Sequence, residues 1–238
     1  MVSTSTLQSL TLQSLHSQFA TAHATATPLS DSALMERLQG GRLSNLNLRG
    51  ARLGGLDLSG VDFSGSDLSD ADLSGANLAR ANLRNVDLTR TLLIHSKLTH
   101  AYLDGASLSE ADLSHSQCHS TSFLGAMLYR CKLVQADLTQ AILTHTFAVE
   151  ANFEGAVLAH TDLRWANLSR THLSPGALAQ VRLENVLLRG LHPIQDLDPQ
   201  PSLDPAEVAV AAVRPAAQPV TRKTPGTKHQ SQDSLVMV

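Results

Sequence analysis

Apolar residues recur every five positions along most of this chain. Residues 41–190 divide into thirty consecutive pentapeptides with no insertion. The third residue of each pentapeptide is Leu or Phe in all but two units, where Cys118 and Ala148 stand instead. The first residue is small or of modest size, and the second is mostly polar. A fixed period held over this length predicts a solenoid, in which each unit buries its apolar residues by stacking on its neighbours.

The period of five excludes an ordinary helix or strand, because it fits neither a repeat of 3.6 residues nor an alternation of two. The first and third residues of every unit can both face inward only if the chain turns a corner in each unit. The fifth position supports these corners, since it often holds a residue that favours turns. Examples are Asn45, Gly50, Gly55, Gly60, Gly65 and His95.

Six units begin with Ala, continue with Asp or Asn and then have Leu. They are Ala71-Asp72-Leu73, Ala76-Asn77-Leu78, Ala81-Asn82-Leu83, Ala111-Asp112-Leu113, Ala136-Asp137-Leu138 and Ala166-Asn167-Leu168. With these units the chain resembles the pentapeptide-repeat family, whose motif is A(D/N)LXX, over 150 of its 238 residues. The resemblance implies an all-β fold, a right-handed quadrilateral parallel β-helix with four pentapeptides per coil. Thirty units would then make about 7.5 coils and, at ~4.8 Å per stacked strand, a rod of about 36 Å.

The regions that flank the repeats differ from them in composition. Residues 1–30 contain no charged side chains and are rich in Ser, Thr and Gln, so we expect a flexible or weakly helical leader. Residues 31–40 start with an N-cap signal and end in Gly, which predicts a short N-terminal capping helix over the first coil. Seven of the nine prolines follow residue 190, so residues 191–238 are predicted to form a Pro-rich disordered tail.

Charge argues against one class of partner, and the two cysteines concern the interior of the rod. The net charge is −3, and residues 41–190 carry fourteen acidic and thirteen basic side chains. Direct nucleic-acid binding requires a basic face, so this balance of charges argues against a nucleic-acid partner. Cys118 and Cys131 fall at inward positions in adjacent coils. We interpret them as small buried hydrophobic side chains, with a disulfide as the alternative.

No motif of an enzyme, a cofactor site or a metal site is found in the sequence. It lacks a Gly-rich loop between a strand and a helix, a nucleophile elbow and a spaced Cys/His quartet. His95 and His115 lie twenty residues apart and should stack, while His100 and His160 share another face. A stacked pair without a third ligand favours a surface ladder over a metal site. We therefore assign no catalytic residue, no cofactor and no metal.

Residues twenty apart become vertical neighbours if four units make a coil. The fifth residues of one series of units then alternate in charge and define what we call the charge row: Asp70, Arg90, Glu110, Arg130, Glu150 and Arg170. Opposite charges at about 4.8 Å backbone spacing favour one another across strands. We expect a structural role for this row, setting register and discouraging edge association, rather than a binding role. Chance alternation is the alternative.

The same arithmetic identifies large apolar residues that should face outward. We call this set the apolar surface: Tyr102, Leu124, Met127, Tyr129, Ile142, Phe147, Val149 and Trp165. A concentrated apolar area on an otherwise polar rod indicates a partner or self-association surface. For Phe147 alone, the alternative is that it turns inward to fill the space beside Ala148.

These features favour a non-enzymatic protein-binding scaffold or regulator. Its partner would be another protein or a second copy of the chain, without direct nucleic-acid or membrane binding. The resemblance adds an alternative, because family members include gyrase-binding quinolone-resistance proteins that imitate DNA, besides a cyanobacterial regulator of heterocyst differentiation. An enzyme or small-ligand binder ranks third, since a filled lumen leaves no pocket. We expect a cytoplasmic location, with organellar or lumenal targeting by residues 1–30 as the alternative.

Overall fold

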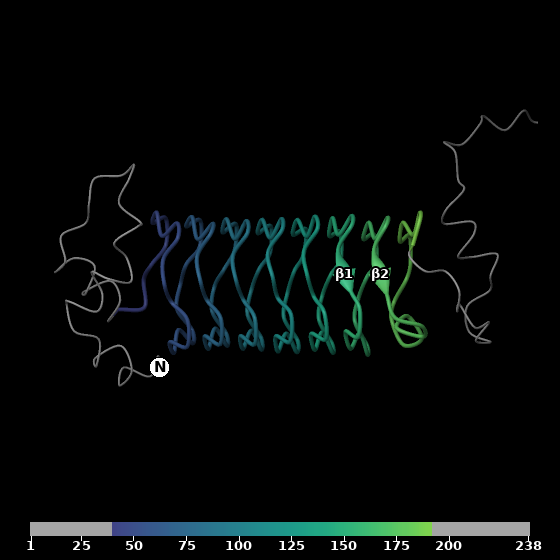
Figure 1. The fold of residues 1–238 in the computed structure, drawn as a ribbon, viewed down its shortest axis with the longest axis horizontal. Coiled ribbons are helices and arrows are strands. Elements are labelled where there is room, and N and C mark those ends of the chain that lie inside the picture. The colour runs from purple at the N-terminus through teal and green to yellow at the C-terminus, as the bar shows by residue number, and fades with distance from the viewer. Residues whose placement is uncertain (1–39, 192–238) are drawn as a thin grey trace, which may run out of the picture.

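Residues 40–191, the part of the chain that the computed structural model describes, form coils stacked along one axis (Figure 1). Parallel bridges join residues twenty apart, from Arg42 with Asp62 to Asn167 with Leu187. One pair extends to two residues, where β1 (Asn152–Phe153) lies parallel to β2 (His172–Leu173). Twenty residues are four pentapeptides, so each coil contains four repeats.

Four sides therefore run along the rod, and each collects every fourth repeat. Side I contains the repeats that begin at residues 41, 61 and so on to 181, while sides II, III and IV begin at residues 46, 51 and 56. Main-chain hydrogen bonds connect successive coils on each side. Leu43 N donates to Asp62 O at 2.7 Å, and Asn45 N donates to Ser64 O at 2.9 Å. Repeated along the rod, these bonds fix the register.

The first and third residues of the repeats fill the lumen. The third residue of each repeat, from Leu43 to Leu188, is buried or half-buried, which confirms the predicted inward direction. Phe63, Phe123 and Phe153 are the largest fully buried side chains. Removal of this apolar surface from water, at about 25 cal/mol per Å², supplies the main stabilisation of the coils.

Asp or Asn at the second position closes the turn that follows it. Its Oδ1 accepts a hydrogen bond from the N–H two residues later, as from Ser74 N to Asp72 Oδ1 at 2.9 Å. Short polar side chains that bind their own backbone in this way favour turns. The bond explains why the repeat prefers Asp or Asn at a position that faces away from the lumen.

The fifth residue of each repeat turns the corner in the left-handed region. Its φ is positive in every repeat from Asn45 to Arg170. Glycine reaches this conformation without strain, and Asn tolerates it better than most residues. Bulky residues do so at a cost, and Trp165, with φ of 63°, is the bulkiest of this series.

One irregularity interrupts the predicted register. Pro175 stands at a fifth position, but the proline ring fixes φ near −65° and cannot take the left-handed corner. Gly176 adopts it instead, with φ of 71°. His160 N consequently donates to Gln180 O rather than to the preceding carbonyl, and pairing twenty residues apart resumes between Asp162 and Arg182. The prediction of one unbroken register to residue 190 is therefore wrong over residues 174–181.

Several predictions lie outside the described residues. They are the leader over residues 1–30, the tail beyond residue 191, and all of the capping helix over residues 31–40 except its last residue.

Candidate functional site

The predicted apolar surface lies on two adjoining sides of the rod. Side I carries Tyr102, Leu124, Ile142 and Trp165, and side II carries Met127, Tyr129, Phe147 and Val149. Seven of these eight side chains are exposed, from 37% at Tyr129 to 57% at Phe147, and Val149 is half-buried. Because Phe147 is exposed while Ala148 is buried, the alternative in which Phe147 fills the lumen is wrong.

A compact block of four residues forms the centre of this surface on side II. Met127 and Phe147 are bridge partners, so they are vertical neighbours. Tyr129 and Val149 follow them two positions later in the same repeats. The Arg130 guanidinium lies 4.9 Å from the Tyr129 ring centre, and the Tyr129 hydroxyl is 3.5 Å from Glu150 Oε2. The charge row thus holds Tyr129 against the edge of the block.

Trp165 projects from the corner between sides I and II. Its indole stacks on His145, with ring centres 6.0 Å apart and planes inclined by 10°, and it remains 55% exposed. Its positive φ is the corner conformation that every repeat from Asn45 to Arg170 shares, so it belongs to the fold. On side I, Arg84 similarly covers Tyr102, with its guanidinium 4.3 Å from the ring centre.

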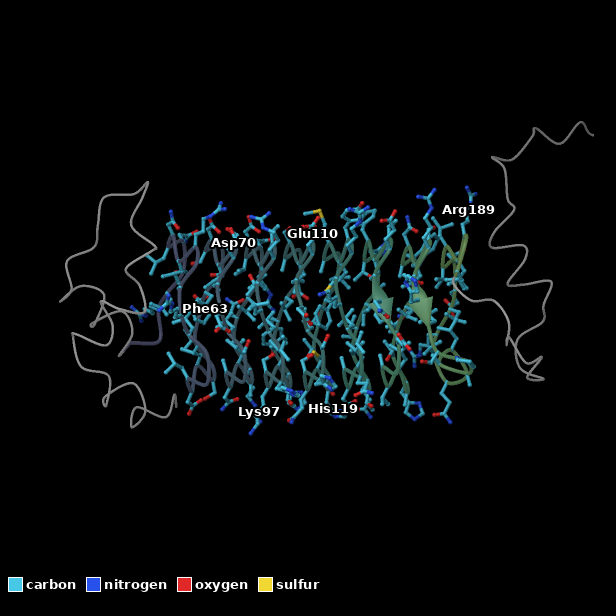
Figure 2. The ribbon with its side chains drawn as sticks, viewed as in Figure 1. Phe63, Asp70, Lys97, Glu110, His119 and Arg189 are labelled. Atoms are coloured by element: carbon cyan, nitrogen blue, oxygen red, sulfur yellow. The ribbon has the colours of Figure 1, made fainter. Side chains whose placement is uncertain are left out.

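The charge row occupies the other edge of side II. Figure 2 shows two of its members, Asp70 and Glu110, along one long edge of the rod, with Arg189 at the far end of the same edge and Lys97 and His119 on the opposite edge. Arg90 donates to Asp70 at 2.7 and 3.0 Å. Further along the row, Arg130 Nε and Arg170 Nη1 donate to Glu150 at 2.7 and 3.4 Å. These hydrogen bonds from Arg90 and Arg130 lower the pKa of Asp70 and Glu150 respectively.

The row is not continuous, however. Within residues 40–191, Glu110 has no cation within 4 Å, so the predicted pairing both above and below each member fails at its centre. Arg49, which the sequence pattern did not predict as a partner, places its Nη2 2.6 Å from Asp70 Oδ2. The sequence contains a signal for this pair. Gly50, which has no side chain, lies directly before Asp70 in the column of fifth positions, and Arg49 precedes Gly50. Two charged clusters result, with Glu110 between them, where its charge still acts on Arg90 and Arg130 and helps to raise the pKa of both.

The remaining candidates have structural explanations. His95 and His115 stack with ring centres 4.9 Å apart, as predicted. Cys118 and Cys131 are both buried and unbonded to each other, and burial raises the pKa of Cys118 to about 12. Residues 40–191 contain no group of three His, Cys, Asp or Glu arranged as a metal site. The same residues include no helix of the length and apolar character needed to cross a bilayer.

The coil of four pentapeptides and its filled lumen define a class of repeat protein. The sequence profile described as "Pentapeptide repeats" matches residues 37–65, 71–109, 106–144 and 143–174, in eight copies. The chain therefore belongs to the pentapeptide-repeat family, whose fold is a right-handed β-helical solenoid.

Three solved structures illustrate the similarity. HetL, a pentapeptide repeat protein involved in heterocyst differentiation regulation in the cyanobacterium Nostoc sp. strain PCC 7120, is 21% identical over 69% of this chain and 94% of its own, with a TM-score of 0.41. QnrB1, a plasmid-mediated fluoroquinolone resistance protein, is 22% identical over 59% and 75%, with a TM-score of 0.48. A protein from the thylakoid lumen of Arabidopsis thaliana is 28% identical over 49% and 70%, with a TM-score of 0.23. No curated protein sequence matches the chain significantly.

Proposed function

We propose that this protein is a non-enzymatic scaffold or regulator that binds another protein through its apolar surface. One observation carries the proposal. Large apolar side chains gather on two adjoining sides, at positions where the repeat otherwise places polar residues, and they stay exposed. A monomeric soluble protein has little use for a contiguous apolar area of this kind.

The fold itself does not require these side chains. Tyr102, Met127, Ile142 and Phe147 all occupy second positions, where Asp or Asn would accept a hydrogen bond from the N–H two residues later. Each replacement gives up such a bond, whose net contribution is about 0.5–1.5 kcal/mol. Apolar residues suit strands in general, but that preference acts on all four sides. By contrast, six of the eight large apolar side chains that are more than 40% exposed in residues 40–191 lie on sides I and II.

The chemistry of the surface suits a protein partner. Trp, Tyr, Phe and Met are the side chains that gain most when a partner removes them from water. The charge row, including Arg130 and Glu150, would form a polar rim that sets orientation and rejects wrong partners. A flat rod side cannot enclose a small molecule, so the proposed ligand is itself a macromolecule.

The structure offers less support for imitation of DNA. The carboxylates of Asp57, Asp62 and Asp67 accept hydrogen bonds from the main chain of their own turns. Asp70 is neutralised on two sides by Arg49 and Arg90. A DNA-like surface needs unpaired negative charge over a long face, and here arginines interrupt it.

A capture experiment with a matched control tests the proposal. The double variant Tyr129→Ser, Trp165→Ser leaves the lumen intact and removes two anchors. The control variant Leu92→Ser, Val157→Ser removes two exposed apolar side chains from sides III and IV. We expect only the first variant to lose proteins that the wild-type chain captures from a lysate of the source organism. Equal capture by all three folded proteins would contradict the proposal.

A further inference from the structure

We propose that the partner of side II is a second copy of this chain, packed antiparallel and face to face. This inference rests on the proposed function, because it names the occupant of part of the apolar surface. The two-fold axis would cross the rod midway between the coils of Arg130 and Glu150. Under such an axis each column of side chains meets the same column of the second copy in reverse order, so residues equally far from the axis face each other.

Charge complementarity is the first argument. In this register Arg130 faces Glu150 of the second copy, and Glu150 faces its Arg130. Glu110, which has no cation within 4 Å among residues 40–191 of its own chain, faces Arg170 of the second copy. Arg170 is 68% exposed and makes only a long contact of 3.4 Å with Glu150, so it can serve both chains. Glu110, where the charge row is interrupted, thereby gains an opposite charge from the second copy.

The apolar residues select this register from the others that the charges allow. An axis midway between Arg130 and Glu150 places Met127 against Phe147 and Tyr129 against Val149 of the second copy. Moving the axis one coil toward the N-terminus, between Glu110 and Arg130, keeps opposite charges together but sets Phe147 against Asp87. An axis at the level of Arg130 would place arginine against arginine. The first register satisfies the charges and brings the four central apolar side chains together, and its one mismatch, Leu187 against Asp87, lies at the end of the overlap.

The shape of the corner between sides I and II also suits this register. There the two protruding rings, His145 and Trp165, face Gly125 and Gly105 of the second copy. A Cβ placed on Gly125 would have no heavy atom within 4 Å, so the space in front of it is open, whereas a Cβ on Gly105 would lie 2.6 Å from Asn85 Oδ1. Along this corner His145 would thus fit the open space at Gly125, while Trp165 would pack on the Asn85 side chain beside Gly105 of the second copy.

The size of the contact predicts its strength. Antiparallel rods in this register overlap from about residue 90 to residue 190, or five coils, which is ~24 Å of one side. A single narrow side of this length buries less than the roughly 800 Å² per partner of standard specific interfaces. We therefore expect a dimer that dissociates on dilution rather than a permanent one.

Sedimentation equilibrium of the full chain, from about 1 to 500 µM, tests the proposal. The first pair of variants is Gly125→His and Gly75→His. Both glycines have φ near +66° and open space around a Cβ, so the strain is matched, but Gly75 lies on the opposite corner of the rod. We expect Gly125→His to weaken dimerisation by about tenfold and Gly75→His to leave it unchanged.

The second pair is Arg130→Glu and Glu150→Arg. Each alone places like charges across the interface and should sediment as a monomer where the wild type is dimeric. Mixed in equal amounts, they restore both opposite-charge contacts, so we expect a heterodimer. Circular dichroism checks that each variant folds. Absence of rescue, or equal effects of the two glycine variants, would overturn the antiparallel register.

The outcomes also separate this inference from the proposed function. A wild-type chain that stays monomeric throughout, while Tyr129→Ser, Trp165→Ser abolishes capture of another protein, would overturn the dimer and leave the binding surface standing. A dimer that the same double variant does not weaken, together with unchanged capture, would overturn both.

Discussion

On sides I and II, the coils of residues 41–90 and those of residues 101–150 share one lumen but differ on the outside. In the earlier coils Asp62 and Asp67 occupy second positions and close their turns by accepting main-chain hydrogen bonds. In the later coils Tyr102, Met127 and Phe147 occupy equivalent positions and project into water. The ladder hydrogen bonds are the same in both parts. The lumen and the main chain therefore specify the fold, whereas the outward second position accepts polar and large apolar residues alike.

The largest effect on stability should appear when a phenylalanine in the lumen and one on the surface are each replaced by alanine. Phe123→Ala removes a fully buried ring and leaves a cavity, so we expect the free energy of unfolding to fall by about 3–5 kcal/mol. Phe147→Ala removes a ring that is 57% exposed and should cost less than about 1 kcal/mol. Urea titrations of both variants check this. Similar losses for the two would mean that Phe147 supports the fold.

The second prediction concerns the turn bonds. Asp62→Ala removes the acceptor for Ser64 N and for the Asn82 amide, so we expect a loss of about 1–2 kcal/mol with dimerisation unchanged. Phe147→Asn supplies a turn acceptor while removing apolar contact, so its stability should stay within about 0.5 kcal/mol of wild type. Its dimerisation should nevertheless be lost. Urea titration measures the stability of each variant, and sedimentation measures its dimerisation. If Asp62→Ala lost dimerisation and Phe147→Asn lost stability instead, the fold and the binding surface would not depend on separate residues.

A third, smaller effect distinguishes two hydroxyl groups inside the lumen. The Thr91 hydroxyl donates to Leu68 O at 2.7 Å, whereas the buried Ser96 hydroxyl has no partner among the described residues. Thr91→Val should therefore lower stability by about 1 kcal/mol, and Ser96→Ala should raise it by about the same amount. Thermal unfolding of the two variants checks the signs. A destabilised Ser96→Ala would indicate an undetected partner, such as buried water.

The smallest effect concerns the charge row. Arg130→Glu places three acidic residues in succession, so we expect a modest loss of stability that shrinks as salt is added. The pH dependence follows from Glu150, whose pKa is lowered chiefly by the hydrogen bond from Arg130. That contribution is present above the unfolded pKa, near 4.3, and is lost as pH falls through the folded value. The difference between variant and wild type should vanish below that range. A loss independent of both salt and pH would indicate packing instead.

The sequence was sufficient for every feature that depends only on the period. The inward leucines, the exposed ring of Phe147 and the column of alternating charges all follow from counting in fives and twenties. Three features depend on local chemistry that counting does not describe. Pro175 displaces a corner because its φ is fixed, and Arg49 reaches Asp70 across a missing side chain. Glu110 has no ion pair within 4 Å among residues 40–191 because Arg90 pairs with Asp70 and Arg130 with Glu150. The first two could have been inferred from residue type, whereas the third depends on rotamers.

Trp165 provides the most direct test of the binding surface, because it is the only tryptophan in the chain. Its fluorescence therefore reports on the apolar surface alone, and at 55% exposure the free indole is open to quenchers. We predict that iodide quenching falls and the emission shifts to shorter wavelength as wild-type protein is concentrated through its dimerisation range. Gly125→His should show neither change, and Gly75→His should behave as wild type. If Trp165 remains equally quenchable in monomer and dimer, and also when a captured partner is bound, this surface does not bind protein and the account is wrong.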